Sequence, residues 1–355
     1  MRRGIANLPL HYGCCPRWLF ERMKKLARAI IEAMVIEFSP EEVLIRLSDP
    51  YWFQSFACVL GFDWHSSGSS TTVCGAIKEA LKGKEKDLGI FVAGGKGKVS
   101  RKTPIEIEEY GERFSLNFTQ KLIYISKIVA KIDNSCLQDG FQIYHHTFIF
   151  TKNGHWAVIQ QGMNEEIQMA RRYHWLSFKT FNFVNEPHTA ICCDFKGKPL
   201  NLVASESEKT REISTQIVRS PFNILLKDFK KIRVLNMPKY HWFPLDSKTE
   251  KRIEKVLYQA HELQPKNFEE LVSYQGVGPK TLRALALISE LIYGAKPSFK
   301  DPVRYSFAHG GKDGFPYPVD KKQYDLSISI LERAIRKAKI KNSEKSQALK
   351  ILYEK

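Results

Sequence analysis

The feature that most constrains the fold is a pair of glycines, Gly276 and Gly278, between two segments whose apolar residues have helical spacing. Glycine adopts backbone angles that other residues avoid, so this spacing predicts a sharp turn between a short helix and a longer one. Pro279 follows directly, and proline is favoured in the first turn of a helix. The turn would present backbone N–H groups and a helix N-terminus, which together suit an anion such as phosphate.

Residues 267–290 resemble the helix-hairpin-helix motif of DNA repair and replication proteins. The resemblance depends on Gly276-Val277-Gly278, followed by Pro279 and Lys280. It implies that this segment grips the nucleic-acid backbone, with little base specificity, through Gly276, Val277, Gly278 and Lys280. Val277 would also fill the space between the two helices. The alternative is an ordinary tight turn between two packed helices.

Two further positions resemble DNA glycosylases of the endonuclease III type and their archaeal relatives that act on oxidised guanine. Lys280 stands soon after the hairpin, where those enzymes carry a Schiff-base nucleophile, and Asp320 follows Pro318-Val319, where they carry an assisting aspartate. The resemblance implies that Lys280 and Asp320 are catalytic. The chain departs from that group in its longer segment 296–317 and in lacking the iron–sulfur cysteines. In the competing interpretation Lys280 only touches phosphate and Asp320 caps a helix.

The segment 301–314 within this insert combines His, Lys, Arg and Asp with glycines and prolines. A purely structural connection rarely has this composition, so we interpret it as a binding loop in which His309 and Lys312 contact nucleic acid or close over a flipped base.

The charge of the chain supports a polyanionic partner. There are 55 Lys and Arg against 38 Asp and Glu, which gives a net charge of +17. Nucleic acid, and DNA in particular, is the expected partner, although the surplus also fits a protein that only needs solubility.

The seven cysteines include no CxxC pair, which argues against a disulfide framework or a zinc finger and favours a reducing, cytoplasmic location. No apolar run is long enough to span a membrane, so no membrane partner is expected.

The pattern of elements predicts an α+β fold. Helix-start signals recur through the first third of the chain, and the Asn153-Gly154 turn between two β-rich runs predicts a type I′ hairpin. A second hairpin is predicted at 196–199, with helical spacing from 206 onward. We therefore expect a mixed domain with β-hairpins over 1–205, an all-α helix-hairpin-helix domain over 206–342 and a basic tail over 343–355.

The centre of the chain is the second candidate for catalysis. A strand with His145 and His146 precedes a returning strand that ends at Gln161, and residues 165–175 are predicted to be a basic helix. Ile159–Gly162 and Ala170–Tyr173 weakly resemble the strand, glycine and arginine-rich helix of the ParB-type nuclease fold. That resemblance implies a catalytic phosphate pocket made by His145, His146, Gln161, Arg171, Arg172 and His174. The cofactor is open: a nuclease would use Mg²⁺ or Mn²⁺, yet no carboxylate cluster with two-metal spacing is evident. The alternative is a basic amphipathic helix that covers a sheet.

Three local sequences, at 2–9, 60–68 and 92–98, resemble an archaeal and thermophilic-bacterial family catalogued as a domain of unknown function. The last of them begins a basic loop that is rich in glycine. Such a loop is suited to cradle phosphates, through Lys96, Lys98, Arg101 and Lys102. The alternative is a mobile basic loop.

Together these features predict a DNA-binding repair or processing enzyme, either a nuclease or a DNA glycosylase/lyase. The competing interpretations are a nucleic-acid-binding module without catalysis and an RNA-processing factor.

Overall fold

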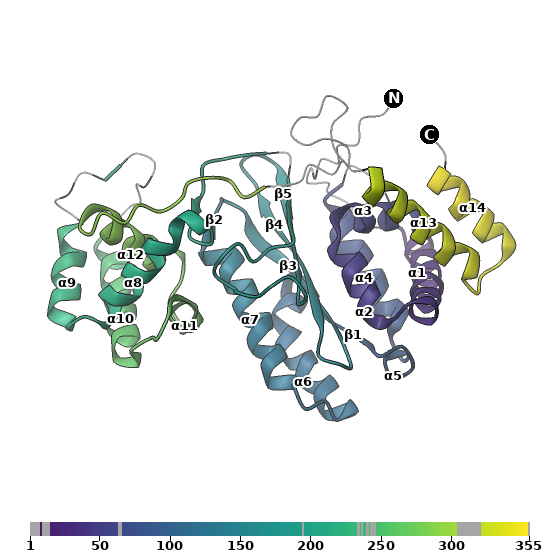
Figure 1. Ribbon diagram of the computed structural model, residues 1–355, viewed down its shortest axis with the longest axis horizontal. Helices are drawn as coiled ribbons and strands as arrows, with labels where there is room; N and C mark the ends of the chain where they lie inside the picture. The colour runs from purple at the N-terminus through teal and green to yellow at the C-terminus, as the bar shows by residue number, and fades with distance from the viewer. Residues whose placement is uncertain are drawn as a thin grey trace.

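The computed structural model describes residues 8, 15–62, 66–193, 195–232, 235, 237–238, 241, 246–303 and 321–353. The protein mixes helices with antiparallel sheets, and Figure 1 shows a central sheet with helices on both sides. No helix in the described ranges is long and apolar enough to cross a membrane.

The central sheet has the strand order β1-β3-β4-β5-β6, and each neighbouring pair is antiparallel. Its strands are β1 (Ile90–Lys96), β3 (Gln142–Thr151), β4 (Trp156–Asn164), β5 (Met169–Leu176) and β6 (Ala190–Cys192). A small second sheet pairs β2 (Leu137–Gln138) with β7 (Leu200–Asn201). Successive side chains on a strand alternate between the two faces, so each central strand contributes to two separate cores.

One face of the sheet packs against the N-terminal helices, and in Figure 1 the yellow C-terminal pair packs on the outer side of those helices. These helices are α1 (Arg17–Glu37), α2 (Pro40–Ser48), α3 (Pro50–Val59), α4 (Gly68–Leu81), α13 (Lys321–Lys337) and α14 (Asn342–Tyr353), with the short α5 (Glu85–Leu88) leading into β1. Their core includes Trp52, Phe53 and Phe56.

The opposite face packs against α6 (Thr103–Phe114) and α7 (Thr119–Ser135), which follow the 3₁₀ segment η1 (Gly97–Lys102). The same core continues into a group of helices that Figure 1 shows beyond α7. This group contains α8 (Glu208–Arg219), which follows η2 (Ser205–Ser207), and then α9 (Phe222–Lys231), α10 (Ser247–Leu263), α11 (Phe268–Ser273) and α12 (Pro279–Leu291). Because Leu285 and Ile132 belong to one continuous core, this group is packed onto the sheet-bearing part of the chain.

Local capping explains several helix boundaries. Ser39 accepts a hydrogen bond from the Glu42 amide at the start of α2, and Asp49 accepts from the amides of Tyr51 and Trp52 at the start of α3. In both helices proline occupies the first turn, where a missing N–H costs no hydrogen bond. These two starts confirm the sequence-based prediction.

The predicted basic helix over 165–175 is wrong. Residues Met169–Leu176 form β5, paired with β4 on one side and β6 on the other. Arg171 and Arg172 therefore point to opposite faces of the sheet instead of sharing one face of a helix. The arginine-rich helix that the ParB-type resemblance implied is absent from this described segment.

Two predicted turns also differ from the structure. Of the two residues Asn153 and Gly154, only Gly154 has a positive φ, and the Gly154 amide donates to the Thr151 carbonyl, so the hairpin is not of type I′. The hairpin predicted at 196–199 is also wrong, because the flanking strands β6 and β7 belong to different sheets.

Most of the predicted basic tail over 343–355 is helical. Asn342–Tyr353 is the helix α14, and its Ala348 is buried in the core that α1 and α3 share. Helix α13, which the sequence had grouped with the helices after residue 206, packs against α1 rather than against α8–α12.

Candidate nucleic-acid interface

The residues predicted to form a central catalytic pocket lie inside the sheet. Each is buried, with a relative exposure of 3% or less: His145, His146, Gln161, Arg171, Arg172 and His174. They divide between the two faces, since His146 and Arg171 face α7 whereas the other four face the N-terminal helices. His145 and His146 therefore project to opposite faces of the sheet, and the six residues do not form the one pocket that the resemblance implied.

Arg171 is held by two carboxylates. Its guanidinium donates to Asp139 Oδ2 at 2.9 Å and to Asp301 Oδ2 at 2.9 Å. Burial raises the pKa of Asp139, while Arg171 and the Tyr173 hydroxyl act in the opposite direction. Because all three charged side chains are almost fully enclosed, this cluster binds the segment around Asp301 to the sheet.

Arg172 and Gln161 belong to a separate polar network under α4. Arg172 donates to the hydroxyls of Ser69 and Ser70 at 2.8 and 2.6 Å, and burial lowers its pKa to about 10. The Ser70 hydroxyl in turn donates to Gln161, whose amide nitrogen donates to the Ser67 carbonyl. The network anchors the start of α4 to the sheet.

A groove of about 950 Å³ lies beside α7. It is bordered by η1 and the start of α6, by the start of β3, and by the first turns of α12. The lining contains four cationic side chains, Arg101, Lys127, Lys131 and Arg283. Its single carboxylate, Asp139, is already paired with Arg171. The groove therefore presents an excess of positive charge.

Helix α7 supplies one wall of this groove. Its groove-lining residues recur at intervals of three and four and so lie on one helical face: Ser126, Lys127, Ala130, Lys131, Asn134 and Ser135. The opposite face carries Ile125, Ile128 and Ile132 into the core. Burial of that apolar face fixes the orientation in which the polar face meets the groove.

Hydrogen bonds hold the glycine turn between α11 and α12 at one end of the groove. Gln138 donates to the Pro279 carbonyl at 2.8 Å and accepts from Arg283 Nε at 2.7 Å. Lys131 donates to the Tyr274 carbonyl, just before the turn, and burial lowers its pKa to about 8. These contacts hold the N-terminus of α12 against α7 and β2.

Within the turn the two glycines differ. Gly276 has φ +87°, and a Cβ there would lie 3.2 Å from Val256, whereas Gly278 has an extended backbone as the residue before α12. Val277 is buried between the helices, as the sequence predicted. Gly276 thus makes the turn possible, and Gly278 joins it to the helix.

Lys280 is exposed and lies on the side of α12 that faces α10, where its ammonium donates to Thr249 Oγ1 at 3.2 Å. It does not line the groove. Three other predicted site residues, His309, Lys312 and Asp320, lie outside the described residues. The proposed pairing of Lys280 with Asp320 is therefore not tested.

The basic segment after β1 borders the groove with exposed cations. Lys96, Lys98, Arg101 and Lys102 are all exposed, and Arg101 lines the groove. The Gly94 amide is not available to a phosphate, because it donates to Glu106 Oε2 at 2.7 Å. A Cβ at Gly94 would lie 2.2 Å from the His146 carbonyl oxygen, so glycine is needed there for close strand packing. The cations of this segment are thus exposed to a ligand, whereas the Gly94 amide is not.

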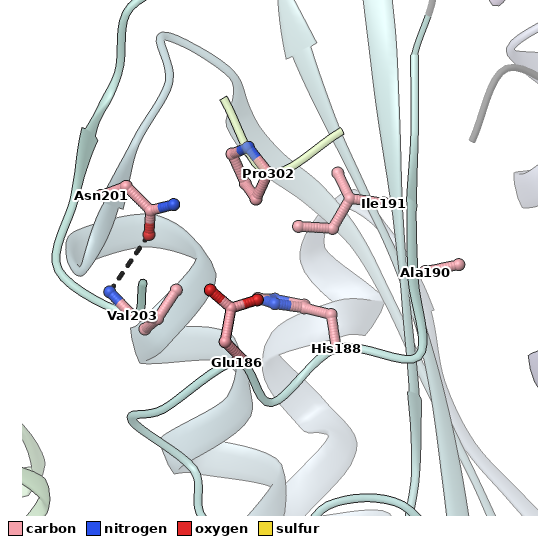
Figure 2. A pocket seen from close by; sticks show the side chains of 7 residues that line it. All are labelled: Glu186, His188, Ala190, Ile191, Asn201, Val203 and Pro302. Carbon is pink, nitrogen blue, oxygen red and sulfur yellow. Dashed lines mark hydrogen bonds between the residues drawn. The ribbon is translucent and has the colours of Figure 1, made fainter. Parts of the chain in front are cut away.

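A small second pocket lies beside β6, the strand at one edge of the central sheet. Figure 2 shows Glu186 and His188 directed into a pocket that Pro302 and Ile191 also line. Its volume of about 10 Å³ is room for a single water at most. No three His, Cys, Asp or Glu side chains in the described ranges are grouped so that they could hold a metal ion.

Sequence reasoning missed the residues of α7 that line the groove, together with Arg283. The signal is present in the sequence, since Ser126, Lys127, Lys131 and Asn134 recur at intervals that place them on one side of a helix.

Comparison with known proteins gives a family and no further relative. A search of curated proteins and a search of solved structures each found no match. Residues 4–319 match the family described as "Protein of unknown function (DUF763)", and because the match covers most of the chain, the protein belongs to that family.

Proposed function

We propose that this protein binds DNA along its phosphate backbone, in the groove between η1, α7 and the N-terminus of α12. One observation carries the proposal: Arg101, Lys127, Lys131 and Arg283 line one groove whose single carboxylate is already neutralised. Phosphate contacts by Lys and Arg supply most of the affinity of sequence-independent binding. The net charge of +17 and the helix-hairpin-helix resemblance at the end of the groove support the same partner.

The N-terminus of α12, directly after the glycine turn, would make a second kind of phosphate contact. The first turn of a helix exposes amides that have no partner within the helix, and the aligned peptide dipoles favour negative charge there. Pro279 and Arg283, one turn apart on α12, both line the groove. A backbone phosphate at that end would meet the helix N-terminus and Arg283 together.

Charge reversal tests the location of the site. The variant Arg101→Glu/Lys127→Glu changes two exposed groove cations, and Arg17→Glu/Lys25→Glu is the matched control on α1, on the other side of the sheet. We expect the groove variant to bind a labelled duplex at least about tenfold more weakly than the wild type. The slope of log K against log salt should also become shallower, by the amount that corresponds to about one to two lost phosphate contacts. The control should retain most of the affinity.

The measurement is fluorescence anisotropy between roughly 50 and 200 mM salt, a range in which such binding falls by orders of magnitude. Equal loss in the two variants would contradict a localised groove, and binding that does not change with salt would contradict backbone recognition altogether. Single-stranded DNA, duplex DNA and RNA of equal length separate the DNA proposal from the RNA alternative.

Catalysis by Lys280 stays a prediction. A lysine nucleophile needs an environment that favours its neutral amine, as desolvation does. Lys280 is exposed, which gives that role no support, and Asp320 lies outside the described residues.

A further inference from the structure

The floor of the groove holds a serine and a histidine in direct contact. Ser126 Oγ, on α7, lies 2.9 Å from Nε2 of His146, on β3. Both residues line the groove, although each is only 2–3% exposed. A hydroxyl bonded to an imidazole beside a cationic hollow is the arrangement of an activated nucleophile.

Neighbouring groups decide which nitrogen of His146 carries the proton. Gln160 must direct its Nε2 toward Asp133 Oδ2, because a carboxylate accepts hydrogen bonds and cannot donate them. Its Oε1 therefore accepts from His146 Nδ1–H at 2.8 Å. That leaves the lone pair on Nε2, directed at the Ser126 hydroxyl, which donates to it.

The supporting residues hold this orientation. Asp133 is completely buried and also accepts from Trp175 Nε1 at 2.9 Å, while its other oxygen lies 2.6 Å from His188 Nε2. Burial lowers the pKa of His146 while Gln160 and Asp133 oppose the shift, so the ring is neutral near pH 7. A neutral imidazole is the form that can accept a proton.

We propose that Ser126 is a nucleophile and His146 its general base, and that their substrate is a phosphodiester held by the cations of the same groove. The proposal rests on the proposed binding of DNA in that groove. Lys127 follows Ser126 in sequence, and Lys131 lies one turn beyond Lys127 on α7, so both lysines line the same groove as Ser126, although the Lys131 ammonium also donates to the Tyr274 carbonyl. Gln160 and Asp133 are positioning residues.

The reaction balances with these groups alone. Ser126 Oγ forms a bond to phosphorus, its proton passes to His146 Nε2, and the bond from phosphorus to one ester oxygen breaks. His146 then returns that proton to the departing oxygen, which leaves as an alcohol. Water next attacks the phosphorus atom of this diester on Ser126 and gives one proton to His146. The bond from phosphorus to Ser126 Oγ breaks, and His146 returns the proton to that oxygen. No oxidant or reductant takes part.

The test uses the full chain and bis(p-nitrophenyl) phosphate, a small phosphodiester whose cleavage releases coloured p-nitrophenolate and needs no DNA binding. Assays run with and without Mg²⁺, and the labelled duplex is tested in parallel. The test variant is Ser126→Ala. The control is Ser48→Ala, which removes the hydroxyl of a buried serine on α2, on the other side of the sheet.

We expect Ser126→Ala to lose at least about 100-fold in turnover, because it removes the nucleophile and with it the proton transfer to His146, a step that by itself contributes this much. The variant should bind DNA within about twofold of wild type, and Ser48→Ala should turn over normally. Mass spectrometry of the quenched wild-type reaction should find the phosphoryl adduct on the peptide that contains Ser126. This measurement needs no variant, so it decides the question even if Ser126→Ala fails to fold.

Wild-type protein that neither turns over the diester nor acquires an adduct overturns this inference, as does a Ser126→Ala variant with wild-type turnover. If such a protein still binds DNA with the expected salt dependence, the proposed function stands. Turnover by a protein that does not bind DNA would instead contradict the proposed function and leave the assignment of Ser126 standing.

Discussion

At the scale of single residues, Arg171 shows how a charged group can be structural. It is fully buried, and its two carboxylate partners, Asp139 and Asp301, are exposed by only 1% and 4%. Replacing it by leucine would leave both carboxylates without their cation. We expect Arg171→Leu to lower the free energy of unfolding by about 3–5 kcal/mol, the usual cost of breaking a buried pair from one side. Urea unfolding monitored by circular dichroism measures the loss.

Lys300→Ala is the control for that prediction. It removes the ion pair with Glu206 from a surface site, where the lysine side chain is 80% exposed and solvent screens the charges. Its unfolding curve should coincide with that of the wild type. If Arg171→Leu were as stable as Lys300→Ala, Arg171 would not be a structural residue. The catalytic role predicted for Arg171 from the sequence would then be favoured instead.

At the scale of elements, the turn between α11 and α12 depends on one glycine more than on the other. An alanine at Gly276 would have to adopt a positive φ and would press its Cβ against Val256, 3.2 Å away. At Gly278 the nearest atom to a new Cβ is 3.8 Å away and φ is ordinary. We expect Gly276→Ala to cost about 1–2 kcal/mol of stability from the left-handed backbone alone, and Gly278→Ala much less.

Thermal unfolding of the two variants, side by side, checks this difference, and duplex binding shows whether the turn also positions the phosphate contacts. If Gly278→Ala weakened DNA binding while it remained fully stable, the backbone at Gly278 would be identified as a contact surface. Equal stability of the two variants would contradict the assignment of the turn to Gly276.

At the scale of the whole molecule, the sheet carries three buried histidines whose burial favours the neutral ring. Burial lowers the pKa of His145 to about 3, and it lowers the pKa of His146 and His174 as well. The unfolded chain binds these protons near pH 6.5 and the folded protein does not, so stability is complete above that pH and falls below it. We expect His145 to contribute a loss approaching roughly 1 kcal/mol per pH unit between about pH 6 and pH 4, and His146 and His174 to add to the loss in the same direction.

Urea unfolding at a series of pH values measures that slope. His174→Phe removes one of the three groups, and the phenyl ring keeps an aromatic contact with Phe53, whose ring centre lies 5.8 Å from that of His174. The variant should lose stability less steeply in acid than the wild type does. Identical slopes would show that His174 is not neutral in the folded protein.

Part of the candidate site could be predicted and part could not. Val277 between the helices and the exposed cations of 96–102 were predicted from local patterns, since turn glycines and basic runs act within a few residues. The groove itself could not be predicted. It joins η1, α7, the start of β3 and α12, and Gln138 contacts Pro279 across 141 residues of chain.

The sequence by itself determined the helix starts at Ser39 and Asp49, the hairpin around Gly154 and the glycine turn before α12, because the groups that act there lie within three or four residues of one another. Only the tertiary structure decided that Met169–Leu176 is a strand. Its arginines made the segment look like a solvent-exposed helix. Inside the sheet Arg171 is instead neutralised by Asp139 and Asp301, which lie 32 and 130 residues away and come close to it only when the chain folds.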